Sequence, residues 1–170
     1  MLGHSVHVVA RHSVDSTEIV DGVNVNYIRG VGNPITRYWR FARSASKKLE
    51  ELNRKLGFDL IHANLPLVPS FAIPEDSAKA LVSTVHSTWK GEAEVTKQGS
   101  RRSLNPNENL MLRFNFLLRS YEKKLMKRSD ALIAVSKYTT EELTDLYGID
   151  EEKLHVIYNG VDVNKFKLVE

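Results

Sequence analysis

The sequence predicts an α/β domain built on a doubly wound, mostly parallel sheet. Short β-type runs alternate with segments of helical period along most of the 170 residues. The runs hold four to six mainly apolar residues between polar ends, which is typical of strands that helices cover on both faces. No internal repeat and no linker interrupts this alternation, so one domain is expected.

Six strands are expected, each a short run of β-type residues that a turn signal or a helical segment separates from the next. One of them alternates apolar and polar residues directly after the turn signal Asp21-Gly22. The expected strands cover residues 5–10, 23–28, 59–63, 80–85, 130–135 and 154–158.

Two long amphipathic helices are expected between these strands. The first has apolar residues spaced three and four apart over residues 38–56, and Gly57 stops it. The second covers residues 110–128. Its apolar stripe consists of Leu110, Phe114, Leu117, Tyr121 and Leu125.

A third, shorter helix is expected over residues 137–147. Ser136 comes directly after a predicted strand, where a serine is a natural N-cap, and Gly148 follows the last helical residue. Local signals therefore fix both ends of this helix.

Composition excludes several classes of protein. The chain is 42% hydrophobic and 26% charged, which is ordinary for a soluble globular domain. It has no cysteine, so disulfide scaffolds, thiol nucleophiles and thiolate metal sites are excluded. It shows neither an apolar run long enough for a membrane span nor a secretory leader, and we therefore expect a cytoplasmic protein.

Charge is distributed unevenly along the chain. Residues 101–128 hold eight Lys and Arg against two acids, whereas residues 129–170 hold four against nine. Such a basic segment marks either a surface that meets phosphates or anionic lipid, or an ordinary solvated helix face. Nucleic-acid binding is not expected, because the segment lacks interleaved aromatic residues and a known binding module.

Polar residues gather where the predicted strands end. Ligands of open α/β sheets bind at the carboxyl ends of the strands, where loops and helix N-termini present backbone donors. These residues, which suit a polyhydroxylated ligand, are the candidate substrate-binding set. They are His62 and Asn64, then His86, Ser87 and Thr88, then Ser136, and finally Asn159 and Gly160.

Each of these candidates also has a structural explanation. A single histidine at a strand end, such as His62 or His86, is more often a hydrogen-bonded structural residue than a ligand-binding one. Ser136 is explained as an N-cap, and Asn159-Gly160 as a turn.

Motifs for other chemistries are missing. The chain has no G-x-G-x-x-G, no P-loop and no G-x-S-x-G, so dinucleotide binding, P-loop hydrolysis and a nucleophile elbow lack their signatures. The remaining histidines lack metal-ligand spacing with a carboxylate, and neither a metal nor a cofactor is expected. These histidines are His4, His7, His12 and His155.

Several segments in the same order resemble the retaining glycosyltransferases of family 4. Near the start, GHSVHVV at residues 3–9 is similar to the family's GHEVHVV. FDLIHA at 58–63 is similar to the family's FDVIHAH, and STVH at 83–86 to its TVHD. The end of the chain is similar to the family pattern AD.IIAVS…YGI…KI.VIPNGVD...F. The matching segments there are SDALIAVS at 129–136, YGI at 147–149, and KLHVIYNGVD at 153–162 followed by Phe166.

The resemblance implies a GT-B fold, in which two Rossmann-like domains face each other across a cleft. Residues 1–163 would form the N-terminal, acceptor-side domain, and residues 164–170 would start the interdomain linker. The family's nucleotide-sugar donor, commonly a UDP- or GDP-sugar, binds mainly to the other domain. The chain alone is therefore expected to be inactive in transferring a sugar to a sugar or lipid acceptor.

The resemblance also assigns roles to individual residues. His86 matches the histidine that contacts the donor sugar, and Ser87 replaces the family's usual Asp. Asn64 stands where a second histidine or a polar residue is common, and Tyr158 replaces the proline of IPNG. No carboxylate is nominated as a nucleophile, and no catalytic residue is assigned.

By comparison with the family, the chain lacks a first central strand. The strands at 5–10 and 59–63 are then each expected to lose a partner edge, which must close up, pair with another chain or stay exposed. Self-association through such edges is one expected consequence.

Relatives that act on lipid acceptors dock to membranes through a basic amphipathic element. A peripheral contact with the inner membrane face or an anionic acceptor is therefore considered at Arg37, Arg40, Arg43, Arg101 and Arg102, together with Arg113. A solvated helix face is the other explanation of these residues.

The alternative function is a non-catalytic Rossmann-like module that binds a sugar or nucleotide with the same strand ends.

Overall fold

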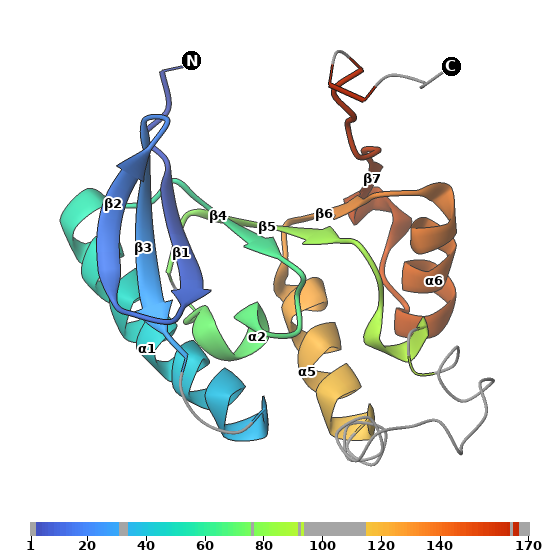
Figure 1. Ribbon diagram of the computed structural model, residues 1–170. Coiled ribbons are helices and arrows are strands. Elements are labelled where there is room, and N and C mark those ends of the chain that lie inside the picture. The colour runs from blue at the N-terminus through green and yellow to red at the C-terminus, as the bar shows by residue number, and fades with distance from the viewer. Residues whose placement is uncertain are drawn as a thin grey trace.

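The computed structural model describes residues 3–30, 34–75, 77–91, 93, 115–163 and 165–166. Within these residues the strands form two separate sheets (Figure 1). The prediction of an α/β chain with mostly parallel pairing is confirmed.

The first sheet has three strands in the order β1-β3-β2. Its strands are β1 (His7–His12), β2 (Ser16–Val20) and β3 (Val23–Arg29). β1 and β3 are parallel, whereas β2 and β3 form an antiparallel hairpin. Asp21 and Gly22 join them with φ of 50° and 81°, and positive φ at both central residues is the mark of a type I′ turn. β2 was not expected from the sequence.

The second sheet has four parallel strands in chain order. They are β4 (Leu60–Asn64), β5 (Ala80–Val85), β6 (Ala131–Ala134) and β7 (Leu154–Val156). Each lies within one or two residues of its expected bounds. The carboxyl ends of all four strands therefore meet along one rim of this sheet.

β1 and β4 each lie at the edge of their own sheet. No strand among the described residues pairs with their outer edges, so the two sheets share no ladder (Figure 1). The prediction that these two strands each have an unpaired edge is confirmed. The outcome is the exposed one of the alternatives considered, and self-association through the edges stays a prediction.

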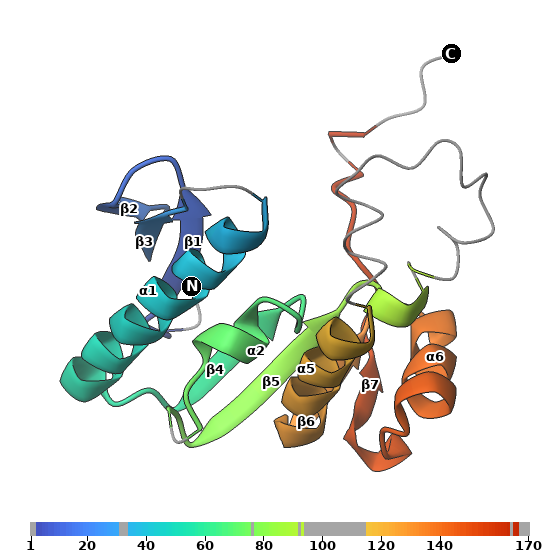
Figure 2. The same ribbon diagram turned by 90° about the horizontal axis from the view of Figure 1, so that it is seen from below.

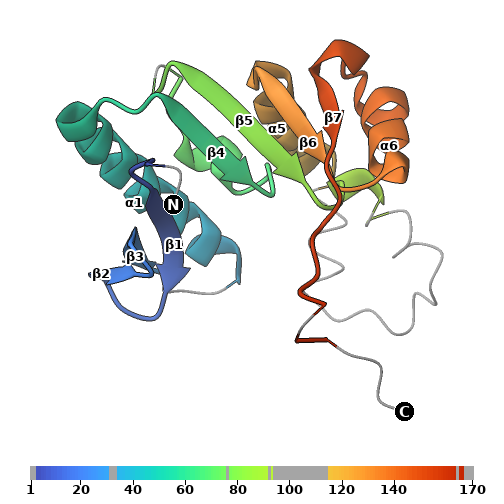
Figure 3. The same ribbon diagram turned by 90° about the horizontal axis from the view of Figure 1, so that it is seen from above.

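The described helices lie on one side of the sheets. They are α1 (Pro34–Leu56), α2 (Pro69–Ala72), α5 (Asn115–Arg128) and α6 (Lys137–Tyr147), followed by a 3-10 helix at Glu151–Lys153. Seen from below, α1, α2 and α5 lie over the strands, whereas from above the strands are uncovered (Figures 2 and 3). β4 shows the consequence, because Ile61 and Ala63 are buried while Leu60 and His62 are exposed.

The helices pack as their sequence patterns predict, except for one face of α5. α1 ends before Gly57, which has φ of 63°. On α5, Leu117 and Tyr121 of the predicted stripe are 52% and 40% exposed, whereas Glu122 and Met126 are buried. The stripe is therefore right at Leu125, which is 2% exposed, and wrong at Leu117 and Tyr121. The buried face instead includes the Glu122 carboxylate, which an apolar pattern does not select.

The core is largest on the four-stranded sheet. There β5, β6, α5 and α6 bury Val85, Met126, Leu132, Ala134, Leu143 and Tyr147 completely. A smaller cluster joins α1 and α2 to β3. The ring centroid of Phe71 (α2) lies 4.5 Å from that of Trp39 (α1) and 4.4 Å from that of Tyr121 (α5), with the rings tilted. This aromatic cluster joins the helices of the two sheets.

Candidate functional site

Two of the predicted site residues meet at the carboxyl ends of β4 and β5. Asn64 is the last residue of β4 and His86 follows β5 directly. Their side chains are in contact, with His86 Nε2 2.9 Å from Asn64 Oδ1. Both side chains are exposed, so this pair presents an imidazole and an amide to the solvent at the rim. We call it the His86–Asn64 pair.

His62 lies inside β4 rather than at its end. Its Nε2 is 2.7 Å from the hydroxyl of Thr84 on β5, and Thr84 itself is 9% exposed. This contact links the two strands on the face that no described helix covers. Nε2 of His62 is therefore engaged in a hydrogen bond between strands, as expected of a structural histidine.

The segment after His86 turns away from the rim and begins a helical turn at Trp89. Thr88 is 1% exposed, and its hydroxyl accepts a hydrogen bond from the Gly91 backbone N–H at 3.0 Å. Thr88 therefore serves as a cap inside the protein, whereas Ser87 is half-buried beside the exposed His86.

Ser136 is the N-cap of α6. Its hydroxyl accepts a hydrogen bond from the Thr139 backbone N–H at 3.0 Å, and Gly148 ends the helix with φ of 60°. Asn159 and Gly160 are exposed in an irregular segment beyond β7, and the turn suggested for them is not formed.

Sequence reasoning missed two buried residues next to this rim. Glu122 on α5 is 3% exposed, and its carboxylate accepts hydrogen bonds from the Trp89 backbone N–H and the Tyr147 hydroxyl. Tyr147 on α6 is fully buried, and burial and the Glu122 carboxylate raise the pKa of its hydroxyl above the ordinary value. No sequence motif marks Glu122, since it lies beside lysines on a basic helix, where the sequence suggests a solvent-exposed face.

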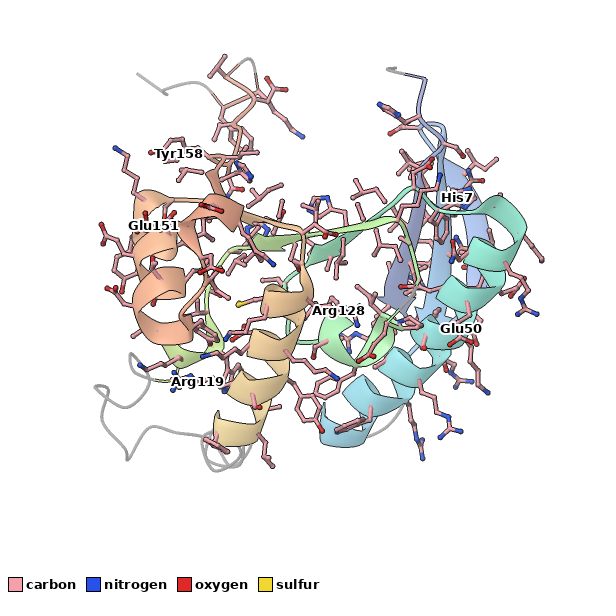
Figure 4. The ribbon with its side chains drawn as sticks, turned by 180° about the vertical axis from the view of Figure 1, so that it is seen from behind. His7, Glu50, Arg119, Arg128, Glu151 and Tyr158 are labelled. Atoms are coloured by element: carbon pink, nitrogen blue, oxygen red, sulfur yellow. The ribbon has the colours of Figure 1, made fainter. Side chains whose placement is uncertain are left out.

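The basic residues divide into structural and exposed ones. Arg119 donates to the Leu146 carbonyl on the α6 side of α5, and Arg128 donates to the Ile73 carbonyl on the α2 side (Figure 4). Arg40 and Arg43 are exposed on α1. Arg37 belongs to α1, but its side chain lies outside the described residues, as do Arg101, Arg102 and Arg113 entirely.

Neither a metal cluster nor a membrane helix is found in the described part of the chain. No three His, Asp or Glu side chains gather there as metal ligands would. No helix there combines the length and the apolar character that crossing a bilayer requires. A hollow of about 460 Å³ lies between β2, β3 and α1, and none of the predicted site residues line it.

Comparison with known proteins identifies the family. The sequence model of Glycosyltransferase Family 4 matches residues 1–165. An uncharacterised glycosyltransferase of Methanocaldococcus jannaschii is 26% identical over 98% of this chain and 40% of its own length. A glycogen synthase of Mycobacterium tuberculosis is 27% identical over 64% of this chain and 23% of its own length.

A solved structure shows the same fold. Sucrose-phosphate synthase of Thermosynechococcus elongatus superposes with a TM-score of 0.71 at 15% identity, over 98% of this chain and 41% of that one. This likeness places the two sheets and their helices in a Rossmann-like domain of the GT-B type. The chain spans less than half the length of these relatives. With a family match over nearly all of its residues, it belongs to glycosyltransferase family 4.

Proposed function

We propose that this chain is the acceptor-side domain of a retaining glycosyltransferase that moves a sugar from a nucleotide-sugar to an acceptor. Residues 1–163 would form the domain, and residues 164–170 would lead into the linker. The single observation that supports this most is the exposed His86–Asn64 pair at the strand ends of a chain that matches family 4 over residues 1–165.

The His86–Asn64 pair suits the recognition of sugar hydroxyls. An amide oxygen only accepts hydrogen bonds, so in this contact the Nε2 of His86 donates. The Asn64 amide nitrogen then adds a donor, and the second ring nitrogen of His86 adds a further polar group for a ligand hydroxyl. This set of polar groups would orient the transferred sugar, and stabilisation of the leaving diphosphate would fall to groups outside this chain.

Transfer is therefore expected only from a longer protein that also carries the second domain. The 170-residue chain and a longer product of the same gene would be assayed for release of nucleotide from UDP- and GDP-hexoses in the presence of sugar or lipid acceptors. Transfer by the longer protein alone supports the proposal. Transfer by the 170-residue chain alone contradicts the expected inactivity, and donor binding without transfer by the longer protein favours the non-catalytic binding module.

The role of His86 can be tested within the same assay. His86→Ala in the longer protein is expected to reduce transfer by about a hundredfold, because it removes a polar group that positions the transferred sugar. His12→Ala is the matched control, because His12 is exposed at the end of β1 on the other sheet. Equal activity of both variants would remove His86 from the site.

We also propose that the acceptor-side domain contacts an anionic surface through α1. That surface would be the inner, cytoplasmic face of the membrane. Exposed Arg40 and Arg43 support this proposal, with Arg37, Arg101 and Arg102 as further candidates. Sedimentation with anionic and neutral liposomes would test it. Binding to anionic liposomes that an Arg40→Glu, Arg43→Glu variant loses is the expected result, and failure to bind either kind contradicts it.

A further inference from the structure

The Glu122 carboxylate lies at the start of the helical turn that follows the rim. Both of its oxygens face the Trp89 backbone N–H, at 3.1 and 3.3 Å. The first N–H groups of a helical segment have no partner within it and carry a partial positive charge. A buried carboxylate at this position therefore takes the place that a bound anion would otherwise have.

Tyr147 completes the arrangement from α6. Its hydroxyl donates to Glu122 and accepts from the Lys90 backbone N–H at 3.1 Å. The Arg119 guanidinium lies over the ring, with its central carbon 5.5 Å from the ring centroid. Because its pKa is raised, the phenol stays protonated and remains a donor to the carboxylate.

Gly91, in the same turn, is also held by neighbouring side chains. The Gly91 N–H donates to the Thr88 hydroxyl at 3.0 Å. A Cβ at Gly91 would meet the carboxylate of Glu142 on α6, so the backbone at Gly91 lies directly against the end of that side chain. Residues 88–91 are thus clamped between α5 and α6, three residues after the end of β5.

We propose that Glu122 and Tyr147 are positioning residues for His86: by fixing the backbone at Trp89 and Lys90, they hold the imidazole beside Asn64. This inference rests on the proposed function, because it gives the buried pair a purpose at the sugar-binding rim. Neither residue reaches the rim itself, and both act through residues 86–90.

Amide exchange and histidine NMR signals of the 170-residue chain test this directly. Tyr147→Phe is expected to speed exchange at Lys90, and Glu122→Gln at Trp89, by about tenfold each, as the loss of one hydrogen bond predicts. Both variants are expected to shift the His86 ring signals and leave those of His12 unchanged. Glu122→Gln keeps the volume but replaces one of the two acceptor oxygens by an NH2 donor, so it weakens these hydrogen bonds and serves if Tyr147→Phe unfolds.

Tyr138→Phe is the matched control, because Tyr138 is 68% exposed on the same helix. It should alter neither the exchange nor the His86 signals. Unchanged His86 signals in folded Glu122→Gln and Tyr147→Phe proteins would overturn the inference.

A second test separates positioning from general stability. In the longer protein, Tyr147→Phe should lower transfer in the wild-type background but cause no further loss in a His86→Ala background, because the two residues would act through the same ring. Equal losses in both backgrounds would contradict the inference. If the longer wild-type protein transfers no sugar, the proposed function fails while the NMR result still decides the positioning role.

Discussion

The two sheets of this chain differ in how they are buried. In the four-stranded sheet, β5 and β6 bury Ser83, Val85, Leu132 and Ala134 completely beneath α5 and α6. In the three-stranded sheet, every residue of β2 is exposed and β1 has no fully buried residue. Parallel strands gain stability from burial by helices, so the four-stranded half should carry most of the free energy of unfolding. The candidate rim belongs to this half.

The largest expected effect is on packing within the four-stranded half. Leu143→Ala removes a fully buried side chain of α6 and should lower the free energy of unfolding by about 2–5 kcal/mol. Ile19→Ala on β2, where the side chain is 72% exposed, should change it by less than about 0.5 kcal/mol. Urea unfolding followed by circular dichroism measures both. Equal losses would show that the two halves do not differ in this way.

Removing the buried hydroxyl of Tyr147 should have the next largest effect. Tyr147→Phe leaves the Lys90 N–H and the Glu122 carboxylate each without a partner, at a cost of about 1–3 kcal/mol. Tyr27→Phe on β3 is the comparison from the other sheet, since Tyr27 is only half-buried and its hydroxyl bonds to Glu18, which is exposed and can bond to water instead. We expect the urea midpoint to fall clearly in the first variant and little in the second.

Loss of the α6 N-cap should cost about 1 kcal/mol. Ser136→Ala removes the acceptor of the Thr139 N–H while leaving the backbone unchanged. Ser136→Asp restores an acceptor and should recover most of that loss. Thermal unfolding of the two variants measures the difference. A melting temperature of Ser136→Ala equal to that of the wild type would mean that the cap contributes little.

The smallest effect is expected from an exposed ion pair before β4 and β5. Lys79 Nζ lies 2.6 Å from Asp59 Oδ1, and this contact holds the pKa of Asp59 below its ordinary value. Since the unfolded chain then binds the proton more readily, the pair stabilises the fold above the ordinary Asp pKa. The stabilisation is lost as the pH falls through the lowered value. Asp59→Asn should therefore flatten the fall of the urea midpoint slightly between about pH 5 and pH 3, and high salt should do the same.

The accuracy of the sequence predictions follows how local the signals are. α6 was predicted at its observed bounds, because Ser136 and Gly148 specify its ends independently of the rest of the fold. β2 was missed, because it packs no side chain into the core and its residues Ser16–Val20 therefore show no apolar alternation. The turn Asp21-Gly22 with two positive φ values was the available signal, since this dipeptide favours a two-residue hairpin.

The candidate site was predictable only where it lies at strand ends. His86 and Asn64 follow the ends of expected strands, and the topology brings them together. Glu122 could not be found in this way, because its burial depends on the tertiary approach of residues 88–91 to α5. Similarly, the pairing of His62 with Thr84 depends on the register between β4 and β5, which the sequence does not specify.

The two tryptophans lie in different parts of the fold, so their fluorescence can follow the unfolding of each part separately. Trp39 lies on α1, 54% exposed, in the aromatic cluster between the helices of the two sheets, and Trp89 lies in the turn that Glu122 and Tyr147 hold in the four-stranded half. Since the sequence contains no other tryptophan, the tryptophan emission of a Trp39→Phe protein comes from the four-stranded half, and that of a Trp89→Phe protein comes from the aromatic cluster. Two emission curves, recorded against urea, would then show whether the contact between the two sheets is lost before the four-stranded half unfolds or together with it.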